Sequence, residues 1–288
     1  MSADAPKSAS LAERLGYGAD ERLLIVNCDD LGSSHAANVA IEQAIRQGLA
    51  TSATLMVPCP WAYEAARGLA DLDIGVHLTL TAEYPGYRWR SLTGAASLHN
   101  ADGFLPLTAE EVFARADLAE VRAECRAQVD QALAWGVDVT HIDSHMGSVQ
   151  TDRRFFAVYA ELAAEYALPL RMAGASGERA LGFEYRRPAA ALGLVFPDHF
   201  LSPPWGEPTR PVLMQRLPRL RPGVTEVYLH PVADGPELRA YDKAAADIRA
   251  GDHANLLDDA LRALLEDAGV RLISFRPLRD LQRGLVHA

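Results

Sequence analysis

The feature that most constrains the fold of this chain is the alternation of short apolar segments with longer amphipathic ones. Amphipathic stretches such as 35–47 and 108–135 are long enough for helices. The apolar segments have the length of buried strands and lie at 22–28, 54–57, 73–80, 137–143, 168–172, 225–231 and 270–275. Because a helix between two strands returns the chain to the same end of the sheet, such strands pair in parallel. The sequence therefore predicts an α/β fold.

The number of strand–helix units favours a closed barrel over an open doubly wound sheet. A sheet that binds a dinucleotide carries G-x-G-x-x-G after its first strand, whereas here that strand is followed by Asp-Asp-Leu-Gly-Ser-Ser. One α/β barrel uses about 250 residues, which fits a chain of 288 residues. We therefore expect a single distorted TIM-like (β/α) barrel of about seven strands.

The chain is expected to form one domain with irregular additions. Residues 1–20 contain no apolar segment of signal-peptide length and are predicted to form a flexible leader. Residues 21–288 are predicted to form the barrel domain. Within it, 81–106 and 173–211 lose the alternating pattern and are predicted to be long insertions. The second insertion is open to interpretation as a lid, a dimer surface or a plain loop.

Composition limits the class of partner. The 28 Lys and Arg residues against 38 Asp and Glu give a formal net charge of −10, which argues against nucleic-acid binding and against a polybasic membrane anchor. No apolar run approaches the roughly 20 residues of a membrane span. The three cysteines are widely spaced and form no C-x-x-C, as is typical of a reducing compartment. We therefore expect a cytoplasmic protein that binds neither nucleic acid nor a membrane.

Acidic and histidine side chains lie at or near the carboxyl ends of four of the predicted strands. They are Asp29, Asp30, His77, Asp143, His145 and His230. Ligands of parallel α/β folds bind at the carboxyl ends of the strands, so these side chains are expected to converge on one pocket. One carboxylate and two imidazoles with open coordination positions match a catalytic Zn²⁺ or related divalent ion. The pattern predicts metal-assisted hydrolysis without naming the bond.

The segment from His141 to His145 carries an internal constraint. His141, Asp143 and His145 alternate, so they point the same way while a strand continues. They cannot all be inward ligands unless the strand ends. A turn into Met146-Gly147 at the strand tip would bring His145 to the pocket.

Four ordered motifs resemble the YdjC-like family, which includes chitooligosaccharide and hopanoid-associated deacetylases. N-C-D-D-L-G at 27–32 resembles the family's N-A-D-D-[FL]-G signature, and G-V-H-L-T-L at 75–80 resembles its G-[VM]-H-[LF]-x-L element. T-H-I-D-S-H at 140–145 is similar to its T-H-[LI]-D-S-H element, and L-H-P at 229–231 is similar to its late H-P element. I-S-F-R at 273–276 resembles its terminal strand.

The resemblance implies a distorted barrel of the glycoside hydrolase/deacetylase superfamily and one divalent metal ion, zinc or magnesium. Carried over by position, the implied metal ligands are Asp30, His77 and His145. Asp29 is the implied general base and His230 the implied general acid. The resemblance also suggests a homodimer. Chitooligosaccharide members continue the third motif as S-H-x-H-V-H, whereas this chain reads S-H-M-G-S-V and lacks the later histidines.

Five further residues are candidates for contacts to the substrate or to the ligands. Arg171 lies on a strand and is expected to orient Asp29 or hold substrate, and His141 and Asp143 are candidates to orient ligands. Trp89 and Trp205 lie in the irregular segments and can stack on a sugar ring.

The leading functional hypothesis is metal-dependent hydrolysis of an N-acetyl amide, most simply on an amino sugar or an N-acetylated sugar conjugate. A second hypothesis keeps the metal site and changes the substrate to a non-sugar amide, imide or ester. A third is a non-catalytic, metal-containing barrel that acts as a binding or scaffold protein. The presence of both Asp29 and His230 disfavours the third, since a structural metal needs neither.

Overall fold

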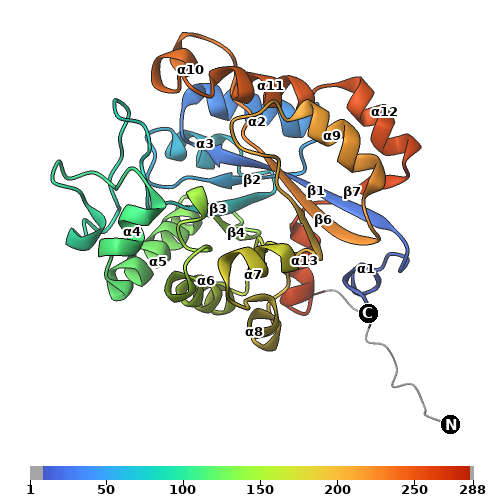
Figure 1. Cartoon of the computed structure of the whole chain (residues 1–288), viewed down its shortest axis with the longest axis horizontal. Coiled ribbons are helices and arrows are strands. Elements are labelled where there is room, and N and C mark those ends of the chain that lie inside the picture. The colour runs from blue at the N-terminus through green and yellow to red at the C-terminus, as the bar shows by residue number, and fades with distance from the viewer. Residues whose placement is uncertain (1–8, 286–288) are drawn as a thin grey trace.

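The structure is a computed structural model, and it describes residues 9–285. Seven strands form one sheet in which every strand pairing is parallel (Figure 1). The strands are β1 (Arg22–Leu31), β2 (Ser52–Leu55), β3 (Ile74–Leu78), β4 (Ile142–Ser144), β5 (His199–Leu201), β6 (Gly223–Leu229) and β7 (Val270–Leu272). The predicted α/β class is confirmed. Seven strands are present as expected, with β5 in place of the strand predicted at 168–172.

Helices connect the strands and account for most of the remaining regular structure. The α-helices are α1 (Leu11–Arg14), α2 (His35–Arg46), α3 (Ala62–Gly68), α4 (Ala109–Arg115), α5 (Leu118–Ala134), α6 (Arg153–Tyr166), α7 (Ala175–Leu181), α8 (Arg186–Ala191), α9 (Arg210–Arg216), α10 (Pro236–Tyr241), α11 (Ala246–Leu256), α12 (Asp259–Asp267) and α13 (Arg276–Gln282). Short 3₁₀ helices are η1 (Ala96–Leu98), η2 (His145–Gly147) and η3 (Leu217–Arg219).

The sheet is a curled half-barrel rather than a closed barrel. Its strand order is β4-β3-β2-β1-β6-β5, with β7 paired to the first residues of β1. The segment predicted as a strand at 168–172 makes one isolated bridge, Leu170 to Ile142, and Leu170 donates to the Val195 carbonyl at 3.1 Å. Pro169 has no N–H to extend a ladder. The predicted closed barrel is therefore corrected to an open sheet whose gap is spanned by irregular chain.

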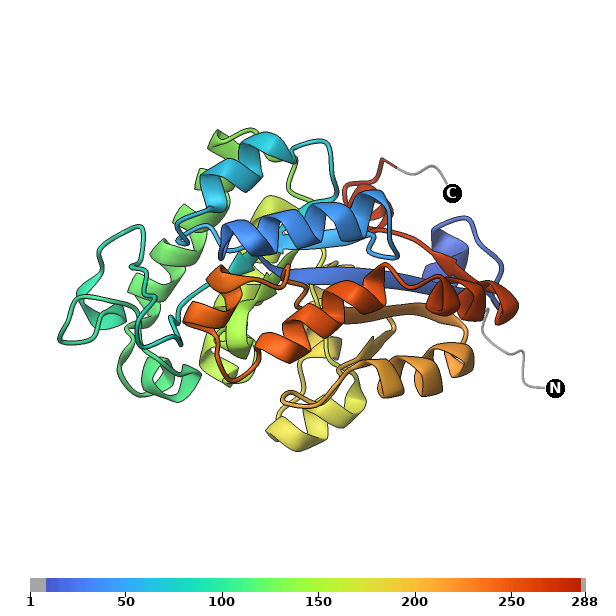
Figure 2. The ribbon, with the colours of Figure 1, turned by 90° about the horizontal axis from the view of Figure 1, so that it is seen from above.

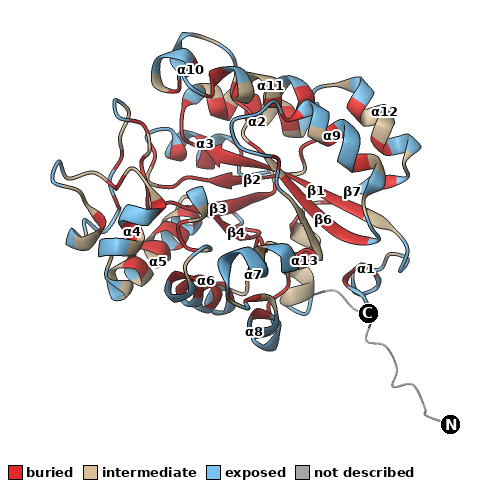
Figure 3. Ribbon diagram, viewed as in Figure 1, coloured by how far each residue is buried: buried red, intermediate tan, exposed pale blue. Residues whose placement is uncertain are grey.

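The sheet is buried and helices pack along its outside. β1 is buried from Leu23 to Leu31 (Figure 3), as expected of a continuous apolar run covered on both faces. Helix α2 packs against β1, α3 against β2 and α5 against β3. Seen from above (Figure 2), α2 and α11 lie side by side along β1.

Part of the expected leader packs against the fold. Residues 1–8 lie outside the described residues. The Ser10 side chain caps α1 by accepting from the Glu13 backbone N–H. The Glu13 carboxylate in turn accepts from the Ser10 backbone N–H. Leu11 and Ala12 are buried in a small core with Phe275 and neighbouring side chains. The leader therefore includes an ordered turn of helix.

Several helix boundaries differ from the sequence-based expectation. The stretch 108–135 is divided into α4 and α5 because the Asp117 carboxylate caps a new helix by accepting from the Ala119 and Glu120 backbone N–H groups. Insertion 81–106 contains η1 and an isolated bridge. Insertion 173–211 contains α7, α8 and β5. Among the described residues, no helix is both long enough and apolar enough to cross a bilayer.

The close packing of β3 against β4 predicts a specific stability effect. A Cβ added at Gly75 would lie 2.6 Å from both Nδ1 and the backbone oxygen of His141. Gly75→Ala is therefore expected to lower the free energy of unfolding by about 1–3 kcal/mol, as overpacked cores do. Gly251, inside α11, has open space around its Cβ position, so Gly251→Ala should raise stability by about 0.5–1 kcal/mol. Urea unfolding of both variants measures the difference, and equal effects would contradict the packing argument.

Candidate functional site

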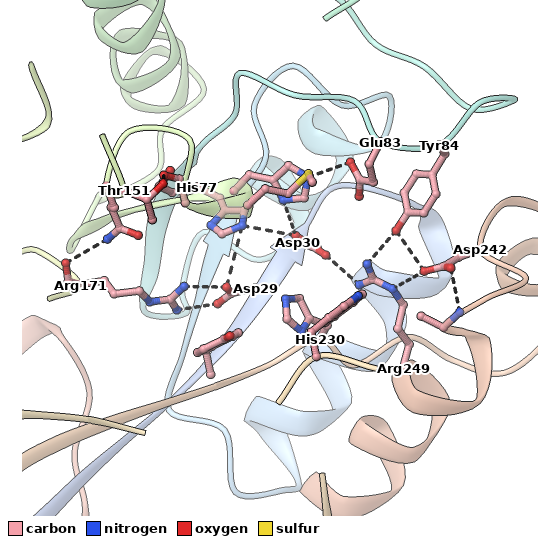
Figure 4. A pocket seen from close by; sticks show the side chains of 18 of the residues that line it. Asp29, Asp30, His77, Glu83, Tyr84, Thr151, Arg171, His230, Asp242 and Arg249 are labelled. Atoms are coloured by element: carbon pink, nitrogen blue, oxygen red, sulfur yellow. Dashed lines mark hydrogen bonds and ion pairs between the residues drawn. The ribbon is translucent and has the colours of Figure 1, made fainter. Parts of the chain in front are cut away.

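A cavity of about 1010 Å³ opens where the strands end. The aspartate pair of β1, His77 of β3 and His230 after β6 line it (Figure 4). His145 after β4 lines it as well. The strand-end side chains predicted to converge therefore do so, with the exceptions given below. This is the edge of a parallel sheet at which α/β proteins bind ligands.

Both aspartates reach the cavity because β1 is irregular at its end. Consecutive side chains of a regular strand point to opposite faces. The register of β1 against β2 shifts between Cys28 and Leu31, and Asp30 has a left-handed φ of 66°. A bulge of this kind redirects a side chain. It places Asp29 and Asp30 on the same side despite their adjacency.

Asp29 is held by Arg171. Both carboxylate oxygens of Asp29 accept from Arg171, each at 2.6 Å, and Asn27 Nδ2 donates to Oδ1 at 2.9 Å. Arg171 is itself fixed by Glu226 at 2.7 Å. Burial opposes ionisation of Asp29, yet the Arg171 guanidinium lowers the pKa of its carboxyl to about 2. Asp29 is therefore a carboxylate at neutral pH. Two roles were expected for Arg171, orienting Asp29 or holding substrate, and these contacts correspond to the first.

Asp30 lies between two histidines. Its Oδ1 is 3.4 Å from His77 Nε2 and 3.2 Å from His145 Nδ1. This oxygen is buried and receives no properly oriented hydrogen bond within residues 9–285. Its Oδ2 accepts from Arg249 Nη1 at 2.8 Å. A buried carboxylate oxygen without a well-oriented hydrogen bond is costly unless a cation lies beside it, as a metal ion or a protonated ring would.

Each histidine is oriented by a carboxylate behind it. His77 Nδ1 is 2.5 Å from Asp143 Oδ1, and His145 Nε2 is 2.9 Å from Glu83 Oε2. Each ring therefore turns its other nitrogen toward Asp30. Carboxylate–histidine pairs of this kind orient the histidine ligands of metal sites.

The electrostatic environment favours a cation. Burial alone would lower both histidine pKa values. Instead Asp143 and Asp29 raise the pKa of His77 to about 10, and Glu83 and Asp30 raise that of His145 to about 9. Carboxylates thus dominate the potential at both rings, and a positive charge placed between them is stabilised.

The donor set of Asp30, His77 and His145 fits a divalent metal ion. Each residue offers one ligand atom, and the three atoms lie within 4.8 Å of one another. The unpartnered Asp30 Oδ1 faces both ring nitrogens, as a shared ion requires. The ligand atoms of a second group, Asp29, His77 and Asp143, also lie within 4.8 Å of one another. Its carboxylates are already paired with Arg171.

The polypeptide delivers His145 by ending β4. The strand stops at Ser144, and η2 begins at His145. Met146 and Gly147 follow with positive φ values of 51° and 67°. The turn expected from the alternation of 141, 143 and 145 is therefore present. Because of it, the side chain of His145 need not point in the direction set by the strand.

His230 occupies the opposite side of the cavity. Its backbone N–H donates to Asp252 Oδ2 at 2.9 Å, and its ring meets Trp205 and Tyr228 edge-on at 4.9 and 5.3 Å. Burial lowers the pKa of His230, although Asp30 and Asp29 oppose the shift. The imidazole of the free protein is therefore neutral at neutral pH.

The remaining predicted residues divide between the cavity and the interior. Trp205 lines the cavity with 60% of its surface exposed. Asp143 is buried behind His77 and also accepts from Thr54 at 2.9 Å. His141 and Trp89 do not line the cavity. The His141 ring stacks on Phe275 at 3.7 Å, and Trp89 is buried with Nε1 donating to the Thr81 carbonyl at 2.8 Å.

Sequence reasoning missed the groups that hold the ligands from behind. Glu83 and Tyr84 belong to insertion 81–106, and Arg249 belongs to α11, which was not predicted. Arg249 lies 219 positions from the aspartate it contacts. The one available hint at Glu83 was that it is an acidic residue soon after the strand that carries His77. No local sequence pattern points to Arg249.

The fold and the cavity define a class: an α/β half-barrel with a divalent-metal donor set at the carboxyl ends of its strands. Sequence comparison gives the family. The chain belongs to the YdjC-like protein family, whose model matches residues 23–267.

The most similar relatives include two carbohydrate deacetylases. One from Geobacillus stearothermophilus is 32% identical over 265 residues, which cover 90% of this chain and 99% of that protein. Another, from Thermus thermophilus, is 42% identical over 158 residues, which cover 55% of this chain and 56% of that protein. A crystal structure from Enterococcus faecalis V583, provisionally named a cellobiose-phosphate cleavage protein, shares the fold. Its TM-score is 0.78 at 24% identity, over 90% of this chain and 99% of that one.

The donor set predicts a selective effect on metal binding. Asp30→Asn is expected to weaken Zn²⁺ binding by more than about 100-fold, because losing a charged ligand costs more than losing an outer partner. Asp73→Asn is the matched control, since Asp73 is a buried carboxylate outside the donor set that accepts from Thr140 and the Arg276 backbone. Chelator competition on the purified proteins measures both affinities. Full-affinity binding by Asp30→Asn would contradict this donor set.

Proposed function

We propose that this protein is a metal-dependent hydrolase that removes an N-acetyl group from an amino sugar or an N-acetylated sugar conjugate. The observation that carries the proposal is the aspartate pair. Asp30 faces two histidines with an oxygen that accepts no well-oriented hydrogen bond, while Asp29 beside it is ionised and clamped by Arg171. One residue is thus suited to hold a metal and its neighbour to accept a proton.

Zn²⁺ suits this set better than Mg²⁺. Two imidazoles and one carboxylate are common zinc ligands, whereas Mg²⁺ prefers an all-oxygen octahedral site. Three protein ligands also leave positions for water and substrate. When bound at Asp30, His77 and His145, a divalent ion would acidify water and polarise an acyl carbonyl.

The side chains then divide the proton transfers. Asp29 accepts a proton as water adds to the acyl carbon, and Arg171 keeps the carboxylate in place for that transfer. Collapse of the adduct breaks the C–N bond and releases acetate and the amine, which must leave with an added proton. His230 lies on the opposite side of the cavity and is the proposed donor. Because its pKa is lowered, His230 starts neutral. We propose that it receives through solvent the proton that Asp29 took from the attacking water and passes it to the leaving nitrogen, so that both side chains return to their starting states.

The cavity supports a sugar as the substrate. Its volume of about 1010 Å³ exceeds the space that one small acyl group needs. Trp205, which is 60% exposed, and Tyr228 both line it and both contact the His230 ring. Relatives named carbohydrate deacetylases align over nearly their full length with this chain. We propose that Trp205 packs on a sugar ring next to the N-acetyl group.

The base assignment predicts loss of activity without loss of metal. Asp29→Asn is expected to lower kcat/KM for acetate release by about 10²–10⁴-fold, the range typical of a general base. The substrates are N-acetylglucosamine, its short oligomers and N-acetylated sugar conjugates, tested after metal removal and addition of Zn²⁺, Mg²⁺, Mn²⁺ or Co²⁺. Metal content of the variant is measured in the same preparation.

Three outcomes separate the hypotheses. Metal-dependent acetate release that disappears in Asp29→Asn with the metal retained supports the proposal. Stoichiometric metal without acetate from any sugar favours the non-sugar amide, imide or ester. Activity of Asp29→Asn equal to that of the unaltered protein would show that Asp29 is not the base.

A further inference from the structure

Arg249 is a buried arginine that contacts a metal-ligand candidate from the side opposite the histidines (Figure 4). Its Nη1 donates to Asp30 Oδ2 at 2.8 Å, its Nε to Asp242 Oδ2 at 2.7 Å and its Nη2 to Tyr84 Oη at 2.7 Å. The three nitrogens of one guanidinium thus bind three different side chains. The planar group is fixed in orientation as well as position.

The partners of Arg249 are themselves anchored. Asp242 accepts from the Ala245 backbone N–H at 3.0 Å and from the Tyr84 hydroxyl at 3.2 Å. Arg249 therefore sits in a closed triangle with Asp242 and Tyr84. The Trp205 ring covers the guanidinium, with its centroid 5.3 Å from the central carbon. Arg249 cannot follow a rotation of Asp30 without breaking these contacts.

The two oxygens of Asp30 consequently have different surroundings. Oδ2 is occupied by Arg249, while Oδ1 faces the two imidazole nitrogens and accepts no hydrogen bond in the described part of the chain. A carboxylate can bind a metal through one oxygen or through both. We propose that Arg249 is a positioning residue that restricts Asp30 to binding a metal through Oδ1 alone. This inference rests on the proposed metal site and is independent of the substrate.

The charge of Arg249 gives the proposal a second consequence. An arginine keeps its positive charge at every accessible pH. A cation on one oxygen of Asp30 repels a second cation on the other, and it draws electron density from the shared carboxylate. Arg249 should therefore weaken metal binding, in contrast to a partner that merely holds the site together.

The coordination of Co²⁺ tests the proposal directly. Arg249→Gln should free Oδ2, raise the coordination number of bound Co²⁺ and weaken its visible absorption. The same variant should bind Zn²⁺ about tenfold more tightly in chelator competition, because the repelling charge is gone. Its melting temperature should rise more on Zn²⁺ addition than that of the unaltered protein.

Arg279 supplies the matched control. It is also a buried arginine, on α13, and it is paired with Asp138, which lies between α5 and β4, and with its neighbour Asp280. Arg279→Gln should lose stability from broken ion pairs while leaving the Co²⁺ spectrum and the Zn²⁺ affinity unchanged. If Arg249→Gln does not fold, Arg249→Lys keeps the charge but cannot bind all three partners, and a smaller spectral change of the same sign is expected.

The possible failures are distinguishable. An unaltered protein that binds no Co²⁺ or Zn²⁺ refutes the proposed metal site, and this inference with it. Metal binding by the unaltered protein together with an identical Co²⁺ spectrum in the folded Arg249 variant overturns this inference alone. Weaker Zn²⁺ binding by Arg249→Gln would likewise overturn it and assign Arg249 a structural role.

Discussion

The burial of two adjacent aspartates at the end of β1 is the constraint on which the rest of the site depends. Two neighbouring carboxylates that are both buried repel each other and lose solvation. The fold meets this cost with one buried arginine for each: Arg171 for Asp29 and Arg249 for Asp30. The cations come from opposite sides, so the two carboxylates are held apart and acquire different environments.

That difference is what allows two chemical roles in adjacent positions. Arg171 takes both oxygens of Asp29, which leaves the group ionised, oriented and unavailable to rotate toward a metal. Arg249 takes one oxygen of Asp30 and leaves the other facing His77 and His145. Under the proposed function, the bidentate contact would fix Asp29 as the base, and the contact to one oxygen would fix Asp30 as a metal ligand. The bulge at Asp30 is the backbone feature that permits both.

How far the sequence predicts this arrangement depends on whether the signal is local. Asp29, Asp30 and His77 could be placed at one sheet edge because parallel strands share their carboxyl ends. The side-chain period of two also predicted that His145 needs a turn. Closure of the barrel could not be predicted, since it depends on hydrogen bonds across the gap near Leu170. The contact of Arg249 with Asp30 joins segments that are far apart in the chain. No local sequence pattern in either segment predicts it.

At residues 146–149 the chain departs from the S-H-x-H-V-H motif. The same reasoning explains why this departure leaves the donor set intact. The chain turns away immediately after His145, through the left-handed Met146 and Gly147. Val149 is fully buried, so its position points into the protein core. Gly147 lines the cavity, and a Cβ there would lie 2.9 Å from Thr151 Cγ2 at a φ that disfavours side chains. A glycine at this position leaves the cavity wall without a side chain beside His145. The cavity wall beside His145 therefore differs from the one that the S-H-x-H-V-H motif would give, while the orientation of His145 stays fixed by Glu83.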